Sequence, residues 1–268
     1  MTRGAQGPEV GEITSRDNPL LKRIRRLAAQ PTAYREAGHI WVEGDHLCRA
    51  AIDRGVAPAV AVVTTHAWHD AACQRLLADA AKVAVVTPAL FASLSGLESP
   101  VGMGALFEWR ARDAVQPGVR TVVLDGVQDA GNVGTIMRCA AAFGVEQVVA
   151  LQGTAALGAV KVLRAAMGAH FSLRCVEGAS LEALDALRVP LLATSSHEGE
   201  EVSDAALPDP CAWVFGHEGQ GVRDQTLARC ERRVRIAQPG GQESLNVAAA
   251  AAICLYVSSR AAGAVLRA

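Results

Sequence analysis

Apolar positions along the chain follow two patterns, which alternate with each other. Short runs rich in Val, Ile and Leu predict buried strands, and apolar residues spaced three or four apart predict amphipathic helices. The first part of the chain combines strands at 40–44, 59–64 and 83–86 with helices at 15–30, 46–54, 68–81 and one opening at Pro88. The second part has strands at 121–124, 147–151, 171–176, 191–193, 212–215 and 234–236, helices between most of them, and a last helix from 247 to about 262. Strands that are apolar throughout and alternate with helices predict an α/β fold, with a parallel sheet covered on both faces.

The same pattern divides the chain into segments. Residues 1–11 are rich in Gly and polar residues, which predicts a disordered start. Residues 12–109 form one α/β unit of domain size. Residues 110–119 are polar and contain Pro117-Gly118, as expected of a linker, and residues 120–268 form the second α/β unit.

Composition narrows the class of protein. Half of the 268 residues are hydrophobic and a fifth are charged, which is ordinary for a soluble protein. No apolar run is long enough to span a bilayer, and the first ten residues lack a signal-peptide pattern, so we expect a cytoplasmic protein without a membrane partner. The seven cysteines are scattered and never form C-x-x-C, and the histidines form no H-E-x-x-H motif, so we expect no metal site.

The net charge is only −1, so overall charge gives no argument for nucleic-acid binding, and only local clusters of basic residues can indicate it. Lys22, Arg23 and Arg26 lie on the first predicted helix, where they form a candidate RNA-binding face. A solvated helix face is the alternative interpretation, and charge alone favours it.

Three stretches of the second unit place polar residues where a predicted strand ends. The first runs from Leu124 to Arg138 and includes Asn132, the second is Gly216–Gly221, and the third is 235–247. Ligands of open α/β sheets bind at the carboxyl ends of the strands. In the third stretch a Gly-rich loop precedes a long Ala-rich helix, which either Ser244 or Asn246 can cap. The three stretches together predict one ligand site.

These stretches resemble the motifs of a known family, the SpoU branch of the SPOUT superfamily of RNA ribose 2′-O-methyltransferases. The family forms N-x-G-x-x-x-R, G-x-E-G-x-G and I-P-x-x-G-x-x-x-S-L-N-V correspond to 132–138, 216–221 and 236–247. Residues 15–19 and 42–44 are similar to the L30e-like RNA-binding domain of the rRNA-modifying members. This chain departs from the family at Ala166, His217 and Ala237, where Ser, Asn or Ala, and Pro are usual.

The resemblance implies a C-terminal trefoil-knot methyltransferase domain, a smaller N-terminal L30e-like domain, a homodimer and S-adenosyl-L-methionine as the cofactor. It implies that the cofactor is held near Gly216, Gly221, Ile236, Gly241 and Leu245. Arg138 would be the catalytic residue, either as a base or by binding a phosphate and polarising the hydroxyl. Four further side chains would orient Arg138, the ribose or the cofactor, namely those of Asn132, Glu218, Ser244 and Asn246.

Other functions remain as alternatives. The N-terminal domain favours ribosomal RNA, most of all 23S rRNA, as the partner. The alternatives are a tRNA ribose methyltransferase and a catalytically inactive RNA-binding protein on the same scaffold. A nucleotide-dependent oxidoreductase would need G-x-G-x-x-G after its first strand. The nearest sequence, Gly102-Met103-Gly104, has Phe107 in place of the third glycine.

Overall fold

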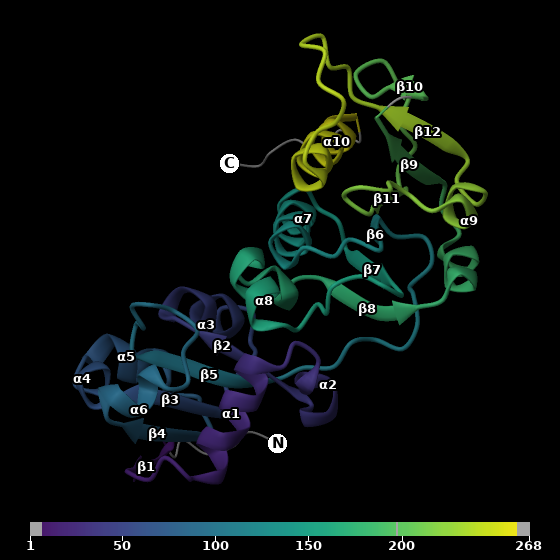
Figure 1. The fold of residues 1–268 in the computed structure, drawn as a ribbon. Coiled ribbons are helices and arrows are strands. Elements are labelled where there is room, and N and C mark those ends of the chain that lie inside the picture. Colours follow the sequence, from purple (N-terminus) through teal and green to yellow (C-terminus); the bar gives the residue numbers. More distant parts are fainter. Residues whose placement is uncertain (1–6, 197, 262–268) are drawn as a thin grey trace. The chain divides into compact units, whose positions relative to one another are not determined.

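The computed structural model describes residues 7–196 and 198–261, and it contains two compact units (Figure 1). Unit 1 comprises residues 1–110 together with 158–171, and unit 2 comprises 111–157 and 172–268. Each unit has its own sheet. No helix in the described ranges has the length and apolar character needed to cross a membrane.

Unit 1 is built on a five-stranded mixed sheet. In spatial order its strands are β1 (Glu9–Ile13), β4 (Lys82–Val86), β3 (Val60–Thr64), β5 (Met103–Glu108) and β2 (His39–Glu43). The first three are parallel, and β5 runs antiparallel to both of its neighbours. The helices of this unit are α1 (Pro19–Ala29), α2 (Ala33–Ala37), α3 (Asp45–Ile52), α4 (Thr65–Trp68), α5 (Ala71–Leu76), α6 (Pro88–Ala92) and α8 (Val160–Ala166).

Two sequence predictions in this unit are wrong. Residues 9–11 are not disordered, because β1 pairs in parallel with β4 at the sheet edge, while residues 1–6 lie outside the described residues. This pairing spans about seventy residues of chain, so local composition does not reveal it. The predicted helix 68–81 is too long, since α4 already ends at Trp68 and α5 covers only Ala71–Leu76. Asp70 caps α5 by accepting a hydrogen bond from Ala72 N–H (2.8 Å).

The segment 158–171 packs within unit 1, although it lies inside the range 120–268 in sequence. A Cβ on Gly158 would lie 2.7 Å from the Tyr34 ring, so only glycine allows this approach. Phe171 makes an edge contact with Phe107, and His170 with Trp109. The helix α8 lies against β2.

Unit 2 is built on a seven-stranded sheet in which every pair of neighbours is parallel, as predicted. Its strands in order are β10 (Glu200–Glu201), β12 (Arg232–Arg235), β9 (Leu191–Ser195), β11 (Ala212–Gly216), β6 (Thr121–Asp125), β7 (Gln147–Leu151) and β8 (Arg174–Ala179). Its α-helices are α7 (Ala130–Ala142), α9 (Asp224–Leu227) and α10 (Val247–Ala261), and α10 packs beside α7 (Figure 1).

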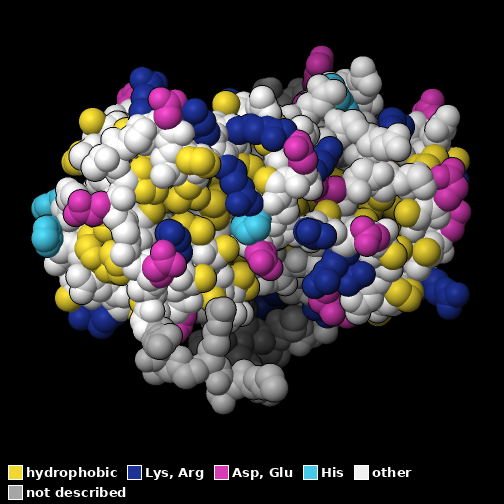
Figure 2. Space-filling view, turned by 90° about the horizontal axis from the view of Figure 1, so that it is seen from below, with side chains coloured by type: hydrophobic (Ala, Val, Ile, Leu, Met, Phe, Trp, Pro, Cys, Tyr) yellow, Lys and Arg dark blue, Asp and Glu magenta, His cyan; other side chains and the backbone are white. Residues whose placement is uncertain are grey.

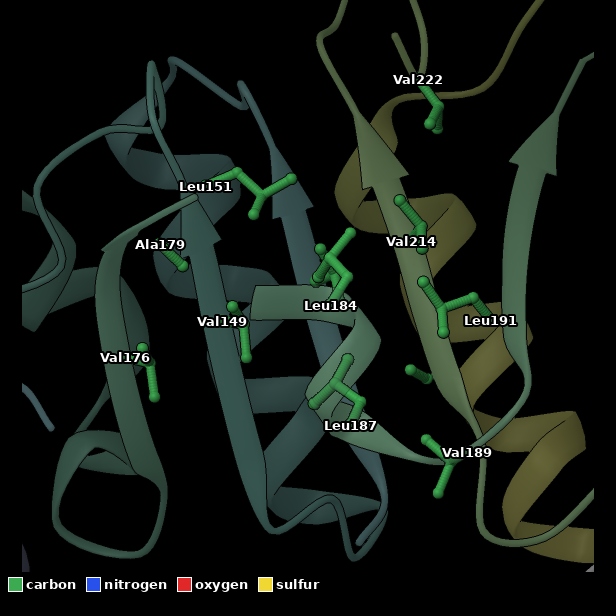
Figure 3. Close-up of a cluster of buried hydrophobic side chains, with 12 residues drawn as sticks. Val149, Leu151, Val176, Ala179, Leu184, Leu187, Val189, Leu191, Val214 and Val222 are labelled. Carbon is green, nitrogen blue, oxygen red and sulfur yellow. The ribbon is translucent and has the colours of Figure 1, made fainter. Parts of the chain in front are cut away.

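The core of unit 2 fixes the sheet. Leu184 and Leu187, from the 3₁₀ segment Leu181–Leu187, lie over one face of the sheet against Val149 and Val214 (Figure 3). All four side chains are at least 99% buried. Burial of this kind stabilises a protein by ~1.5–3 kcal/mol per large apolar side chain, so it holds the strands in register. The carboxyl ends of β6, β9, β11 and β12 therefore meet reproducibly along one sheet edge, where the three motif stretches lie.

Candidate active site

The first motif begins where β6 ends. Asp129 caps α7, because its Oδ1 accepts a hydrogen bond from the N–H of Asn132 (2.7 Å). Asn132 is therefore the third residue of the helix, with its side chain directed away from the helix backbone and available for other partners. Arg138 follows six residues later, in the third turn of α7.

The second motif is a tight turn after β11. His217 and Gly221 form an antiparallel bridge with N–H to O distances of 2.9 and 2.8 Å. A Cβ on Gly216 would lie 2.1 Å from the carbonyl carbon of Gly221, so no other residue fits there. Gly221 has φ of 71°, in the left-handed region that glycine enters without strain. Two of the three glycines in this motif are thus required by the backbone.

One hydrogen-bond chain joins all three motifs. Nδ2 of Asn246 donates to Oδ1 of Asn132 (3.0 Å), and Nδ2 of Asn132 donates to Oε1 of Glu218 (3.0 Å). Asn246 is also the residue that caps α10, since its Oδ1 accepts from the N–H groups of Ala248 (2.9 Å) and Ala249 (3.2 Å). These three residues are 86 and 114 positions apart in sequence, so the fold brings the motifs together.

The carboxylate of Glu218 is the acceptor at the end of this chain. It also accepts the N–H groups of Asp129 (3.1 Å) and Gln128 (3.3 Å), in the loop before α7. Partial burial acts to raise the pKa of Glu218, but the bonds from Asn132 and from the backbone outweigh it and hold the pKa below the ordinary value. Glu218 is therefore an ionised acceptor that fastens the turn to the start of α7.

A second carboxylate fastens the same two segments from the other side. Asp125, fully buried at the end of β6, accepts bonds from the backbone N–H (2.8 Å) and Nε (2.6 Å) of Arg223. Arg223 comes shortly after the turn of the second motif. The loop after β6 and the turn after β11 are thus joined by one carboxylate from each side, which restricts their relative motion.

A cleft of about 460 Å³ opens beside this network. Its lining includes six of the predicted site residues, namely Gly216, Glu218, Gly221, Ile236, Ser244 and Leu245. The cleft therefore combines the second and third motifs. Gly241, Asn132 and Asn246 are not among its lining residues, and of these the two asparagines border it through Glu218.

None of the predicted cationic residues is among those that line the cleft. Arg138 is exposed on α7 and has no hydrogen bond or ion pair with any described residue, so its guanidinium is available to a ligand. On α1, Lys22 pairs with Asp17 (2.9 Å) and Arg26 pairs with Glu36, while Arg23 donates to the carbonyl of Ala37 (3.0 Å). Figure 2 shows the same mixture on one face of the molecule, where Lys and Arg side chains are accompanied by Asp and Glu.

Several site residues were not predicted. Thr194, near the end of β9, and Ser196, directly after it, line the cleft, and Gln238 and Glu243 line it from the third motif. A signal for the first two exists in the sequence, because they are polar residues that directly follow a predicted strand, like the three motifs. In the described part of the chain, no three His, Cys, Asp or Glu side chains lie close enough together to hold a metal ion.

Comparison with known proteins now decides the family. The profile of the SpoU rRNA Methylase family matches residues 120–256, and the profile of an MRM3-like substrate binding domain matches residues 18–105. The chain belongs to the SpoU rRNA methylase family. The predicted SpoU-type family and its α/β methyltransferase fold are therefore confirmed.

Individual relatives agree with this assignment. An uncharacterized tRNA/rRNA methyltransferase of Synechocystis is 30% identical over 264 residues, which cover 94% of each chain. The 23S rRNA (guanosine-2′-O-)-methyltransferase RlmB of Bordetella pertussis is 36% identical over 152 residues, 55% of this chain and 62% of that protein. The crystal structure of an AdoMet-bound rRNA methyltransferase from Sinorhizobium meliloti matches 94% of this chain and 98% of that one, with a TM-score of 0.81 and 26% identity.

Proposed function

We propose that this SpoU-family protein transfers the methyl group of S-adenosylmethionine to the 2′-hydroxyl of a ribose in RNA, with 23S ribosomal RNA as the substrate. The observation that carries the proposal is the chain of hydrogen bonds from Asn246 through Asn132 to Glu218, beside a cleft of ligand size. It unites three distant motifs at one edge of a parallel sheet, where α/β proteins bind ligands. The RlmB relative, named as a 23S rRNA 2′-O-methyltransferase, supports the choice of substrate.

The cleft has the properties that S-adenosylmethionine requires. Its volume of about 460 Å³ lies within the range of ~300–1,000 Å³ that is usual for small-molecule sites. Gly221, which is exposed and has open space around its Cα, leaves backbone uncovered for close approach, and Val247 and Ala250 add apolar surface for a base or a thioether. The buried Oε1 of Gln238, which borders the cleft, has no hydrogen-bond partner among the described residues. It is therefore available to accept a hydrogen bond from the ligand.

The residues of this chain have separate roles in the reaction. When bound, the cofactor supplies an electrophilic methyl group on a sulfonium. The backbone at Gly216, Ile236 and Leu245 holds it, and Glu218 keeps the turn after β11 closed against α7. Positioning of this kind accounts for much of the rate of a transfer reaction, up to about 7–11 kcal/mol of the barrier.

Arg138 acts on the RNA. A guanidinium stays protonated in proteins, so charge is the property it offers. Because Arg138 is exposed and has no partner among the described residues, it is free to bind a phosphate next to the target ribose and to polarise the 2′-hydroxyl. The hydroxyl also distinguishes RNA from DNA, so DNA is not a substrate.

The remaining expectations of the family resemblance belong to the same proposal. The C-terminal domain would be tied in a trefoil knot, and two copies of the chain would pair through α10. Ile253 and Tyr256 of α10 support such a surface, with 38% and 49% of their area exposed. Lys22, Arg23 and Arg26 of unit 1 would contact RNA phosphates after exchanging their present partners.

Incubation of the purified protein with methyl-labelled S-adenosylmethionine and separate pools of rRNA, tRNA and single-stranded DNA tests the proposal. Label in 23S rRNA alone is the expected result. Label in tRNA would instead identify a tRNA methyltransferase. Binding of the cofactor without transfer to any pool would support an inactive RNA-binding protein. Binding of NAD in preference to S-adenosylmethionine would support an oxidoreductase instead.

A further inference from the structure

His217 stands at a position where SpoU relatives usually carry Asn or Ala, and its imidazole is part of the turn after β11. The Nδ1 atom lies 3.0 Å from the backbone N of Gly219 and 3.3 Å from the backbone N of Gln220. Both partners are N–H donors, so Nδ1 is the acceptor. The side chain therefore closes the turn in the way that an Asn or Asp oxygen closes an Asx-turn.

Two donors at one nitrogen specify the protonation state of the ring. Only a neutral imidazole with its proton on Nε2 offers a lone pair at Nδ1. In the protonated ring both nitrogens carry hydrogen, and Nδ1–H would then face two other N–H groups. The turn would lose both bonds and gain a repulsive contact, while the backbone bridge between His217 and Gly221 would remain.

The same turn forms one wall of the cleft. Residues 216–222 all line it, so a turn that opens at Gly219 and Gln220 changes the surface that meets the cofactor. His217 is one of these lining residues, and its Cε1 and Nδ1 lie 3.8 Å from the position of a Cβ on Gly219. The geometry of the wall and the protonation of the ring are thus coupled.

We propose that His217 is a positioning residue for the cofactor, whose neutral imidazole holds the turn 217–221 in its binding conformation, so that cofactor affinity falls when this ring is protonated. The inference rests on the proposed placement of S-adenosylmethionine in the cleft. It goes beyond that placement because it assigns a pH dependence to this chain that the usual Asn or Ala would not have.

Other charged groups around the cleft do not reproduce this behaviour. Among the described lining residues they are Glu218, Glu243 and Arg233, and Arg233 is paired with Glu198. Carboxylates take up protons well below neutral pH and guanidinium stays charged. In the range from about pH 8 to about pH 5.5, histidine is the side chain whose charge changes.

The test is a comparison of wild type with H217N, whose side-chain oxygen can accept the same two N–H groups. We expect both proteins to bind S-adenosylmethionine with similar Kd at about pH 8, by calorimetry. At about pH 5.5 the Kd of wild type should exceed that of H217N by about threefold to tenfold, the equivalent of one or two hydrogen bonds. Titration of the cofactor's own amino group affects both proteins equally and cancels in this ratio.

Further variants complete the test. H217A, which has no acceptor at any pH, should bind more weakly than wild type at about pH 8 and approach it at about pH 5.5. The exposed His66 of unit 1 provides the control H66N, which should follow wild type. A ratio between wild type and H217N that stays constant from about pH 8 to about pH 5.5 would overturn the inference while leaving the proposed function intact. Nitrogen-15 NMR of the imidazole at about pH 8 gives an independent result, because a proton found on Nδ1 would also overturn it. Absence of cofactor binding at every pH would instead overturn the proposed function.

Discussion

Replacement of Asn246 by aspartate separates two tasks of one side chain. Its Oδ1 caps α10 by accepting from Ala248 and Ala249, and its Nδ2 donates to Asn132. Aspartate caps helices as well as asparagine does, and its charge is favourable at a helix N-terminus. It has no N–H group, however, so a carboxylate oxygen would face Oδ1 of Asn132.

The network leaves no simple escape from this conflict. A flip of the Asn132 amide would place its nitrogen toward the introduced carboxylate, but would then turn its oxygen toward Oε1 of Glu218. Loss of the bond with an uncompensated acceptor costs about 1–2 kcal/mol at an exposed site. At about 1.36 kcal/mol per factor of ten, N246D should lower the rate of methyl transfer by about 5- to 30-fold.

N246A serves as the matched comparison, because it removes the cap as well as the bond to Asn132. Loss of a cap costs a further ~0.5–2 kcal/mol, so N246A should melt about 2–4 °C or more below N246D, which keeps the cap. The assays are single-turnover methyl transfer with saturating cofactor and thermal unfolding by circular dichroism. Wild-type turnover in N246D would refute the role of the hydrogen-bond chain, and equal loss of Tm in both variants would refute the separation of the two tasks.

Three further predictions concern the same site. R138A should abolish methyl transfer while the Kd for S-adenosylmethionine by calorimetry stays near wild type, because Arg138 lies outside the cleft lining; near-normal turnover would remove it from the reaction. G216A should unfold at lower temperature and lose cofactor binding, since its Cβ would lie 2.1 Å from Gly221, whereas G11A, with open space around it, should do neither. The lowered pKa of Glu218 means that its ionised form stabilises the fold above its ordinary pKa and that this contribution is lost as the pH falls through the lowered value. The stability difference between wild type and E218Q, by urea unfolding, should therefore be largest near neutral pH and shrink below about pH 4.5; a difference that grows with acid would contradict the assignment.

The sequence predicted the parts of this fold that local patterns determine. The central strands β6, β7 and β11 are buried along their whole length because both faces of the parallel sheet are covered, so their positions and parallel pairing followed from periodicity. The predicted strand 171–176 was misplaced, since β8 spans Arg174–Ala179, and the short polar strand β10 was not predicted. The strand β1 was missed because its pairing with β4 is non-local and its residues alternate with Gly and Glu. The packing of 158–171 within unit 1 was missed for a similar reason, since it depends on contacts such as Gly158 beneath Tyr34.

The candidate site followed a different rule. Asn132, Glu218 and Asn246 were singled out because they lie at strand ends and match family motifs, but no local pattern predicts which atom bonds to which. Three-dimensional contacts establish that Asn246, and not Ser244, caps α10, and that Asp129 caps α7. They also show that the carboxylate of Asp125 accepts a hydrogen bond from Arg223. In the sequence, Asp125 is recognisable only as the polar residue at the end of an apolar strand.

The most direct test of the central claim locates the transferred methyl group on the nucleoside. RNA treated with the protein and S-adenosylmethionine would be digested to nucleosides and analysed by mass spectrometry, with R138A as the parallel sample. We predict a 2′-O-methylated nucleoside, whose added mass stays with the ribose on fragmentation, in the wild-type sample and not with R138A. A methyl group that stays with the base would contradict ribose methylation at this site, and so would equal modification by both proteins.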